Sequence, residues 1–425
     1  MSATAVATPG AEPKKEGDAG SGKPKHFPLR KRTGTAHRRL LSAAVDLDVD
    51  ELYELSDAET VRYMAKARWG SATFMPCPHC GAMDEHYWAA KELRWKCTGC
   101  GKRFSVTSAT PFADHKLPLN KILRIIFQWA NPASGRPAVD IRKEHKTSYR
   151  TAFTLAQKLR EGLMRGFNVG ILCGVQEMDG LDLNGRRYKE KRNKPQVTPP
   201  SANGGPKIPE HLLKPKVDAE TGEIVGPPAP PKHGKTARQP EDRRLMLVMR
   251  QRGQLKRRGA VATRVCIAMK EATKTVVAMA QKFASAESKM MSDEDPAYAP
   301  FARLFESHDT VNHSKAYALP GGINNNQAES FNRRMKRAAV AIYLSPSNKY
   351  LADYACEAAW REDLREPSTG GRLMNLLKTV FNVGLSLWWR GYWQGRYRMH
   401  EVLIEGPQEA QGRGKKKGAR PKVPR

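Results

Sequence analysis

Three acidic side chains stand where a metal-dependent phosphoryl-transfer site would need them. Asp179 ends the first predicted strand of an α/β region, Asp293 ends the short run SKMMSD, and Glu329 lies in the helical stretch NNNQAESFNRRMKRA. Carboxylates at the carboxyl ends of neighbouring strands converge at one edge of a sheet, and a packed helix can bring a third. Such a trio can hold two Mg²⁺ ions, for which Mn²⁺ can substitute. Acidic residues are also common at strand ends without any function, so the pattern alone leaves both interpretations open.

Basic side chains accompany the third carboxylate. Lys336 follows Glu329 by seven residues, which is two helical turns, so the two side chains share one face of the helix. Lys336 is therefore a candidate for contacting a DNA phosphate close to the metals. The further candidates for DNA contact on this helix are Arg333, Arg334 and Arg337.

Four of the seven cysteines form two tight pairs, Cys77-Pro-His-Cys80 and Cys97-Thr-Gly-Cys100, separated by 16 residues. Two such turns can complete a tetrahedral site of four thiolates, which is typical of a structural Zn²⁺ ion, with a rubredoxin-like iron centre as the alternative. His79 is expected to face solvent rather than to bind the metal. The remaining cysteines are predicted to be buried core residues: Cys173, Cys266 and Cys356.

Residues 137–164 have the pattern of a helix, a short turn and a second helix that starts near Ser148. Arg150, Lys158 and Arg160 are predicted to lie on or near the exposed face of this second helix. In a helix-turn-helix motif the second helix enters the major groove of DNA. An ordinary helical hairpin with a solvated basic face is the competing interpretation.

The composition favours a nucleic-acid partner. The chain has 425 residues, a formal net charge of +30 and a pI near 10.0, which together favour association with a polyanion. On charge alone, a solvated, ribosome-like basic surface is the competing interpretation. The sequence contains no run of 18 apolar residues, so no membrane span is predicted, and the N-terminus lacks the apolar core of a secretory signal. Paired cysteines in a non-secreted chain indicate a reducing cytosol.

The elements that must position these residues follow an α/β order. After residue 169 the pattern gives three strands, then a helix, a strand, a helix, a strand and further helices. The predicted segments are a disordered basic tail (1–37), a helical lead-in with a cysteine-bearing β-domain (38–106), a helix-turn-helix-like region (107–168), an α/β domain (169–365) interrupted by a Pro-rich insertion (about 189–242), C-terminal aromatic helices (366–406) and a basic tail (407–425).

The order of several motifs resembles one group of bacterial transposases. Asn326-Gln-Ala-Glu329-Ser-Phe331, followed by Lys336, resembles the third acidic motif of D-D-E insertion-sequence transposases with a zinc-ribbon N-terminus, the ISXO-type group (insertion-sequence family fifteen-ninety-five). Glu177-Met-Asp179-Gly180 resembles the first acidic motif of this group, and Asp293 with Tyr298 resembles the second. Further matching segments in order are ARWG before CPHCG, WKCTGCGKRFSVTSATPF, LPLNKILRIIF, HDTVNHSKAY and YLADYACEAAWRED.

The resemblance implies a zinc ribbon followed by an RNase H-like catalytic domain with a mixed sheet flanked by helices. It implies that Asp179, Asp293 and Glu329 bind catalytic Mg²⁺, with Lys336 as the basic residue that follows the Glu. It further implies binding to the terminal inverted repeats and to target DNA, and assembly of a homodimer or a higher oligomer on paired ends. The expected function is therefore DNA cleavage and joining in the bacterial cytoplasm, and the alternative is a catalytically retired, transposase-derived DNA-binding regulator.

Overall fold

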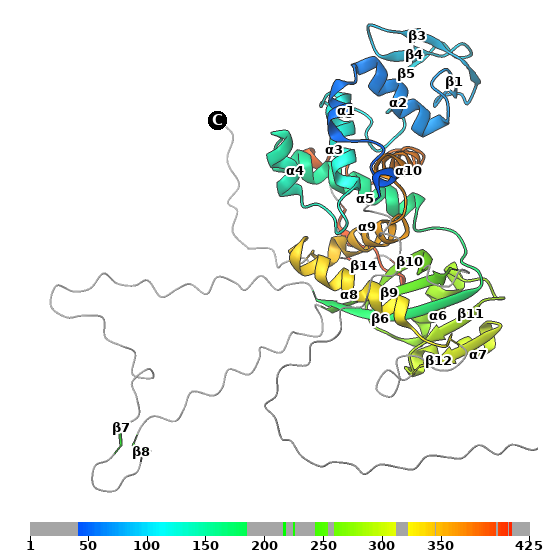
Figure 1. The fold of residues 1–425 in the computed structure, drawn as a ribbon, viewed down its shortest axis with the longest axis vertical. Helices are drawn as coiled ribbons and strands as arrows, with labels where there is room; N and C mark the ends of the chain where they lie inside the picture. The colour runs from blue at the N-terminus through cyan, green and yellow to red at the C-terminus, as the bar shows by residue number, and fades with distance from the viewer. Residues whose placement is uncertain are drawn as a thin grey trace, which may run out of the picture.

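The structure is a computed structural model that describes residues 41–184, 216–217, 224–225, 243–253, 259–311, 322–344, 346–396, 398–406 and 408–409. The predicted N-terminal tail and most of the predicted Pro-rich insertion and C-terminal tail lie outside these residues. Figure 1 shows the small strands β1–β5 at one end of the molecule, the larger sheet at the other, and a group of helices between them. Within the described ranges, no helix is both long and apolar enough to cross a membrane.

The N-terminal part begins with two capped helices, α1 (Val49–Glu54) and α2 (Asp57–Trp69). The predicted capping box at the start of α2 is confirmed, because the Ser56 hydroxyl accepts from the Glu59 amide while the Glu59 carboxylate accepts from the Ser56 amide. Five short strands follow, and they form a two-stranded and a three-stranded antiparallel sheet: β1 (Phe74–Pro76), β2 (Met83–Glu85), β3 (Tyr87–Ala89), β4 (Arg94–Lys96) and β5 (Arg103–Phe104).

The helices between the two ends share one core with the small strands. They are α3 (Leu119–Ala130), α4 (Ala138–His145), α5 (Tyr149–Gly166) and, from the C-terminal part of the chain, α10 (Thr369–Phe381). Met75, Trp95 and Phe104 of the small strands belong to the same buried cluster as the apolar faces of these helices. The predicted boundary at Ser148 is confirmed, since its hydroxyl caps α5.

The larger sheet has the strand order β10-β9-β6-β11-β12. Its strands are β6 (Val175–Asn184), β9 (Arg243–Arg252), β10 (Ala260–Ala268), β11 (Lys289–Ser292) and β12 (Ser307–Thr310). The first three pair antiparallel, whereas β11 pairs parallel with both β6 and β12. Two further small hairpins are formed by β7 (Lys216–Val217) with β8 (Ile224–Val225) and by β13 (His400–Glu401) with β14 (Gln408–Glu409).

Helices cover both faces of this sheet. Helices α8 (Asn326–Ala341) and α9 (Leu351–Asp363) pack on one face, over alternate residues of β9 such as Met246 and Val248. Helix α6 (Thr273–Phe283) and the short helix α7 (Phe301–Leu304) pack on the other face, over the intervening residues of β9. The result is the helix-flanked mixed sheet that the RNase H-like fold predicts.

Three expectations about local structure were wrong. Strand β6 continues past Asp179 to Asn184, because Leu181 and Leu183 keep the alternating apolar pattern and pack under α8 and α9. The predicted C-terminal aromatic helices reduce to α10, since the chain turns at Gly384 and Gly391, whose φ angles are 82° and 76°. Cys173 is exposed rather than buried.

Candidate active site and cysteine centre

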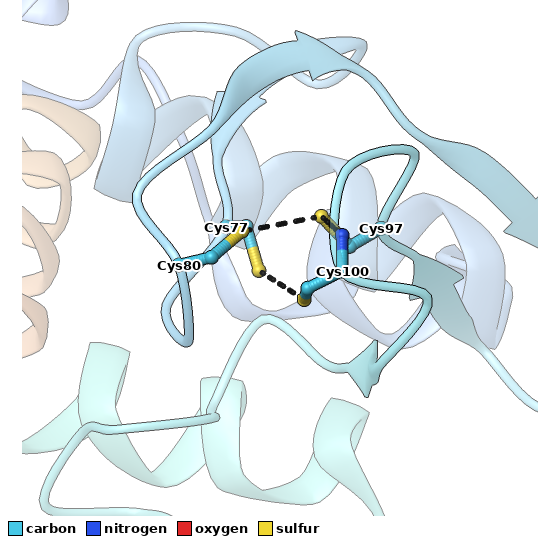
Figure 2. Close-up of side chains that lie close together, drawn as sticks. All are labelled: Cys77, Cys80, Cys97 and Cys100. Carbon is cyan, nitrogen blue, oxygen red and sulfur yellow. Dashed lines mark hydrogen bonds between the residues drawn. The ribbon is translucent and has the colours of Figure 1, made fainter.

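The four cysteines of the two C-x₂-C turns face one another. Figure 2 shows the side chains of Cys77, Cys80, Cys97 and Cys100 converging from two loops. The four Sγ atoms all lie within 4.8 Å of one another, with Cys77 Sγ 3.9 Å from Cys100 Sγ and Cys80 Sγ 3.6 Å from Cys97 Sγ. Tetrahedral coordination with Zn–S bonds of about 2.3 Å places sulfur atoms about 3.8 Å apart, so these sulfurs fit a Zn²⁺ ion.

The local backbone prepares these thiols for a metal. The amide of Cys100 donates to Cys97 Sγ at 3.4 Å, and this hydrogen bond is the largest effect that lowers the pKa of the Cys97 thiol to about 6. The amide of His79 donates likewise to Cys77 Sγ, while the His79 side chain is exposed, as predicted. All four positions of the tetrahedron are filled by protein, so the ion has a structural role.

Asp179 and Asp293 meet at the junction of β6 and β11. The parallel register pairs Met291 with Glu177. Asp293 follows β11 directly, two residues after Met291, and its charge acts on Asp179, two residues after Glu177. On its other side Asp179 lies opposite Val248, whose side chain packs on the α8 face, so the Asp179 carboxylate faces α8 as well. The structure therefore brings together the two strand carboxylates that the sequence singled out.

This pair of carboxylates is electrostatically strained. Burial, followed by the neighbouring charge of Asp293, raises the pKa of Asp179 to about 7. Hydrogen bonds from the Asn332 side chain, at 2.8 Å, and from the Gly180 amide, at 2.9 Å, act in the opposite direction. A positive charge bound next to Asp179 would therefore strongly favour the ionised form of its carboxylate.

Glu329 lies on the flank of α8 that faces β11. Gln327 lies on the opposite flank, because two residues are separated by about 200° around a helix, and its Oε1 accepts from the Ala260 amide of β10. Asn332, three residues after Glu329, reaches Asp179. Glu329 is thus placed on the side where the two aspartates lie, although in this structure its carboxylate accepts from Arg333 at 3.0 Å.

The three carboxylates do not form a closed ligand set in this structure. In the part of the chain that the structure describes, the four cysteines are the only group of three or more potential metal ligands whose atoms all lie within 4.8 Å. The strand pair nevertheless fits Mg²⁺ in its chemistry, because this ion prefers oxygen donors and because burial and the neighbouring Asp293 charge both disfavour an ionised Asp179 without a cation.

The basic candidates separate into two groups. On α8, Lys336 and Arg337 are exposed, while Arg333 and Arg334 pair with Glu329 and Glu362, respectively. Lys336 lies two turns from Glu329 on the same flank, as predicted from their spacing. Lys336 and Arg337 therefore carry exposed positive charge about two helical turns after Glu329.

On α5, the prediction of an exposed basic face was wrong for Arg160. Its side chain is only 2% exposed, and its Nε donates to Glu357 Oε2 of α9 at 2.6 Å. Lys158 is half-buried, and burial lowers its pKa. Arg150, in the first turn, is exposed and remains available to DNA. Arg160 therefore joins α5 to α9 and has no access to a nucleic acid.

Glu271 is a carboxylate that the sequence analysis missed. Its carboxylate accepts a hydrogen bond from the Tyr298 hydroxyl at 2.6 Å. Its Oε1 would also lie 2.6 Å from a Cβ at residue 180, so any residue other than glycine at that position would clash with Glu271. Its charge also contributes to the raised pKa of Asp179. One sequence feature could have drawn attention to Glu271, namely its position just after the end of β10. Its distance along the chain from Asp179, however, gives no sign that the two residues are neighbours.

Two family matches agree with this arrangement. Residues 222–363 match the ISXO2-like transposase domain, and residues 55–103 match the transposase zinc-ribbon domain. The first match includes Asp293 and Glu329 and begins after Asp179; the second includes all four cysteines of the metal centre. A search of the curated proteins found no match. These matches confirm the resemblance for the zinc ribbon and for the domain that carries Asp293 and Glu329.

Proposed function

Because the chain carries the zinc-ribbon domain and the ISXO2-like domain of an insertion-sequence transposase, we propose that it binds terminal inverted repeats and catalyses metal-dependent DNA strand cleavage and strand transfer. In the proposed reaction, water attacks one strand at the end of the element, and the freed 3′-hydroxyl then attacks target DNA. The observation that supports this proposal most is the nearness of Asp293 to Asp179, because burial and then the charge of Asp293 raise the pKa of Asp179.

The proposed catalytic residues are Asp179, Asp293 and Glu329. When bound between these carboxylates, two Mg²⁺ ions would supply activation of the attacking oxygen and stabilisation of the leaving oxygen. Asn332 keeps the Asp179 carboxylate oriented through its hydrogen bond, and Glu329 would leave Arg333 to face the aspartates. Lys336, on the same flank of α8, is proposed to bind a phosphate of the DNA next to the scissile one.

Recognition of the element ends is assigned to the N-terminal modules. The zinc ribbon and helices α4 and α5 form one continuous core with α10, so they present their surfaces to DNA as a single rigid unit. Exposed basic residues at the α4–α5 turn, Arg142, Lys143, Lys146 and Arg150, supply phosphate contacts there. We propose that two or more protomers bring paired ends together, as the chemistry of joining two ends to one target requires.

Strand transfer gives a direct test of this function. With Mg²⁺, the protein is expected to join a pre-cleaved duplex of its own element end, carrying a free 3′-hydroxyl, to a supercoiled plasmid. The matched control is the same duplex with a 3′-dideoxy terminus, which lacks the attacking group and should give no joined product. Binding of both duplexes with joining of neither, in Mg²⁺ and in Mn²⁺, would show instead a DNA-binding regulator without catalysis.

The pKa of Asp179 predicts a pH dependence of metal binding. A divalent ion needs the ionised carboxylate, so its binding displaces the proton that Asp179 holds below pH 7. The affinity for Mn²⁺ should therefore rise about tenfold per pH unit up to about pH 7 and then level off. Titrations of Mn²⁺ followed by electron paramagnetic resonance at several pH values measure this slope, and in Asp179→Asn the rise should disappear.

The same raised pKa has a consequence for the metal-free protein. Because the folded-state pKa of about 7 lies above the ordinary value of 3.8, protonated Asp179 stabilises the fold below about pH 4, and this contribution is lost as the pH rises through 7. Asp179→Asn should therefore be more thermostable than the wild type at about pH 8, and this gain should shrink as the pH falls and be smallest below about pH 4. A gain that does not depend on pH would contradict the shifted pKa.

A further inference from the structure

Glu177 is a buried carboxylate that the proposed chemistry does not use. It lies on β6 two residues before Asp179, and its side chain is fully shielded from solvent. Since side chains alternate along a strand, Glu177 points to the same face as Asp179, toward α8. A buried charge at this position must be compensated by nearby groups, or its cost would be large.

The partners of Glu177 belong to the start of α8 and to β9. Its Oε2 accepts from the backbone amides of Gln327 and Ala328, at 2.6 and 3.1 Å, and its Oε1 accepts from Arg252 Nε at 2.5 Å. The N-cap residue of α8, Asn325, makes no capping bond with its own side chain. Glu177 therefore caps the helix from the neighbouring strand, where the first-turn amides favour a negative charge.

Arg252 completes this arrangement on the chain that leads into the helix. Its two terminal nitrogens donate to the carbonyl oxygens of Gly322, at 2.8 Å, and Asn324, at 2.6 Å. One planar guanidinium thus holds the Glu177 carboxylate and the segment before α8 at the same time. The Glu177–Arg252 pair fixes both where α8 begins and how it enters the site.

Two more hydrogen bonds attach α8 and its N-cap residue to β6. The Asn325 side chain donates to the Met178 carbonyl at 3.1 Å, and the Asn332 side chain donates to Asp179 Oδ2 at 2.8 Å. Glu329 lies between these attachment points. Its position relative to Asp179 is therefore set by how the N-terminus of α8 docks on Glu177.

We propose that Glu177 and Arg252 are positioning residues that place the Glu329 carboxylate for binding a divalent cation together with Asp179 and Asp293. This inference rests on the proposed function. It adds that Glu177 and Arg252 fix the distance between the two strand carboxylates and the helix carboxylate. Residues that orient metal ligands typically change metal affinity or activity by about 10- to 100-fold when altered.

A second buried pair on the same strand provides a matched control. Arg244 of β9 binds Glu401 with its Nε and with a terminal nitrogen, at 2.6 and 2.9 Å, and Glu401 is 6% exposed. This pair resembles Glu177–Arg252 in its hydrogen bonding, since an arginine of β9 binds a buried carboxylate, but it joins β9 to β13 rather than to the start of α8. Replacing Glu401 is therefore expected to lower the stability of the protein without affecting the metal site.

The test compares Glu177→Gln with Glu401→Gln in the full-length protein. Both variants should lose thermal stability, because each leaves an arginine of β9 without its buried carboxylate partner. Only Glu177→Gln should bind Mn²⁺ more weakly, by about 10- to 100-fold, in titrations followed by electron paramagnetic resonance. Only this variant should also show faster hydrogen exchange at the amides of Gln327 and Ala328, and its DNA cleavage should recover at high Mn²⁺ because all three ligands remain.

The possible outcomes are distinguishable. If the wild type binds Mn²⁺ no more tightly than Asp179→Asn does, the proposed metal site itself fails. If the wild type binds Mn²⁺ in the expected way but Glu177→Gln binds it equally well, the positioning role is overturned. If Glu177→Gln does not fold, Arg252→Lys serves for the same comparison, since it keeps the charge but lacks the fork that reaches Gly322 and Asn324.

Discussion

Replacing Asp179, Asp293 or Glu329 with the corresponding amide is expected to reduce DNA strand cleavage by about 100- to 1000-fold or more. Each change keeps the shape of the side chain and removes a charged oxygen ligand, so metal binding suffers while packing does not. For Asp179 the change also relieves the repulsion from Asp293 that raises its pKa. The fold and the affinity for the element ends should therefore stay close to those of the wild type.

The measurement is single-turnover cleavage of a labelled element end, accompanied by a gel-shift titration of the same DNA. Glu306→Gln is a suitable control, because Glu306 is a half-exposed acidic residue of the same domain that pairs with Lys289 on the surface. This variant should cleave normally. An equal loss of DNA binding in all three amide variants would instead indicate that these carboxylates have a structural role.

The second large effect is expected at the zinc centre. Cys97→Ser should unfold the ribbon and strongly weaken binding to element ends, because a structural Zn²⁺ ion contributes about 10–16 kcal/mol to the folding of small zinc domains. The consequences extend beyond the ribbon, since Met75, Trp95 and Phe104 belong to the same core as α2, α3 and α5. Zinc content, measured by atomic absorption, should fall from one ion per chain to none.

Cys173→Ser controls for the loss of a thiol as such. Cys173 is exposed and lies outside the ribbon, so its replacement should leave both the zinc content and the affinity for element ends unchanged. The catalytic sheet has its own apolar clusters, so Cys97→Ser should still show the hydrogen-exchange protection of β6 and β9. Normal zinc content and normal end affinity in Cys97→Ser would refute the assignment of the centre.

Local sequence signals predicted the elements and the spacing of the two candidate metal sites. The C-x₂-C pairs gave the cysteine centre directly, because all four ligands come from two short turns. The alternating and helical patterns gave the strand and helix order, including the start of β11 and α8. Asp293 could be placed at the end of its strand because the apolar run SKMMS stops there. Such features depend on residues that are close together in the sequence, so they can be predicted from one sequence alone.

Other features depend on contacts between residues that are far apart in the chain. Arg160 has the helical spacing of an exposed residue, yet it is buried against Glu357, 197 residues later, and no local pattern shows this. The partnership of Glu177 with α8 likewise joins residues 150 positions apart. Glu271 comes close to Asp179 only because β10, β9 and β6 lie in one sheet. In each case the tertiary fold overrides what the local sequence suggests.

The most direct test of the catalytic carboxylates uses labelled DNA from the two element ends that flank the gene. Wild-type protein and Asp179→Asn are incubated with this DNA in Mg²⁺ and in EDTA, and the products are mapped to the nucleotide. We expect a nick at one defined position that leaves a 3′-hydroxyl and is present only with the wild type in Mg²⁺. Specific binding without nicking in Mg²⁺ or Mn²⁺, or equal nicking by Asp179→Asn, would contradict it.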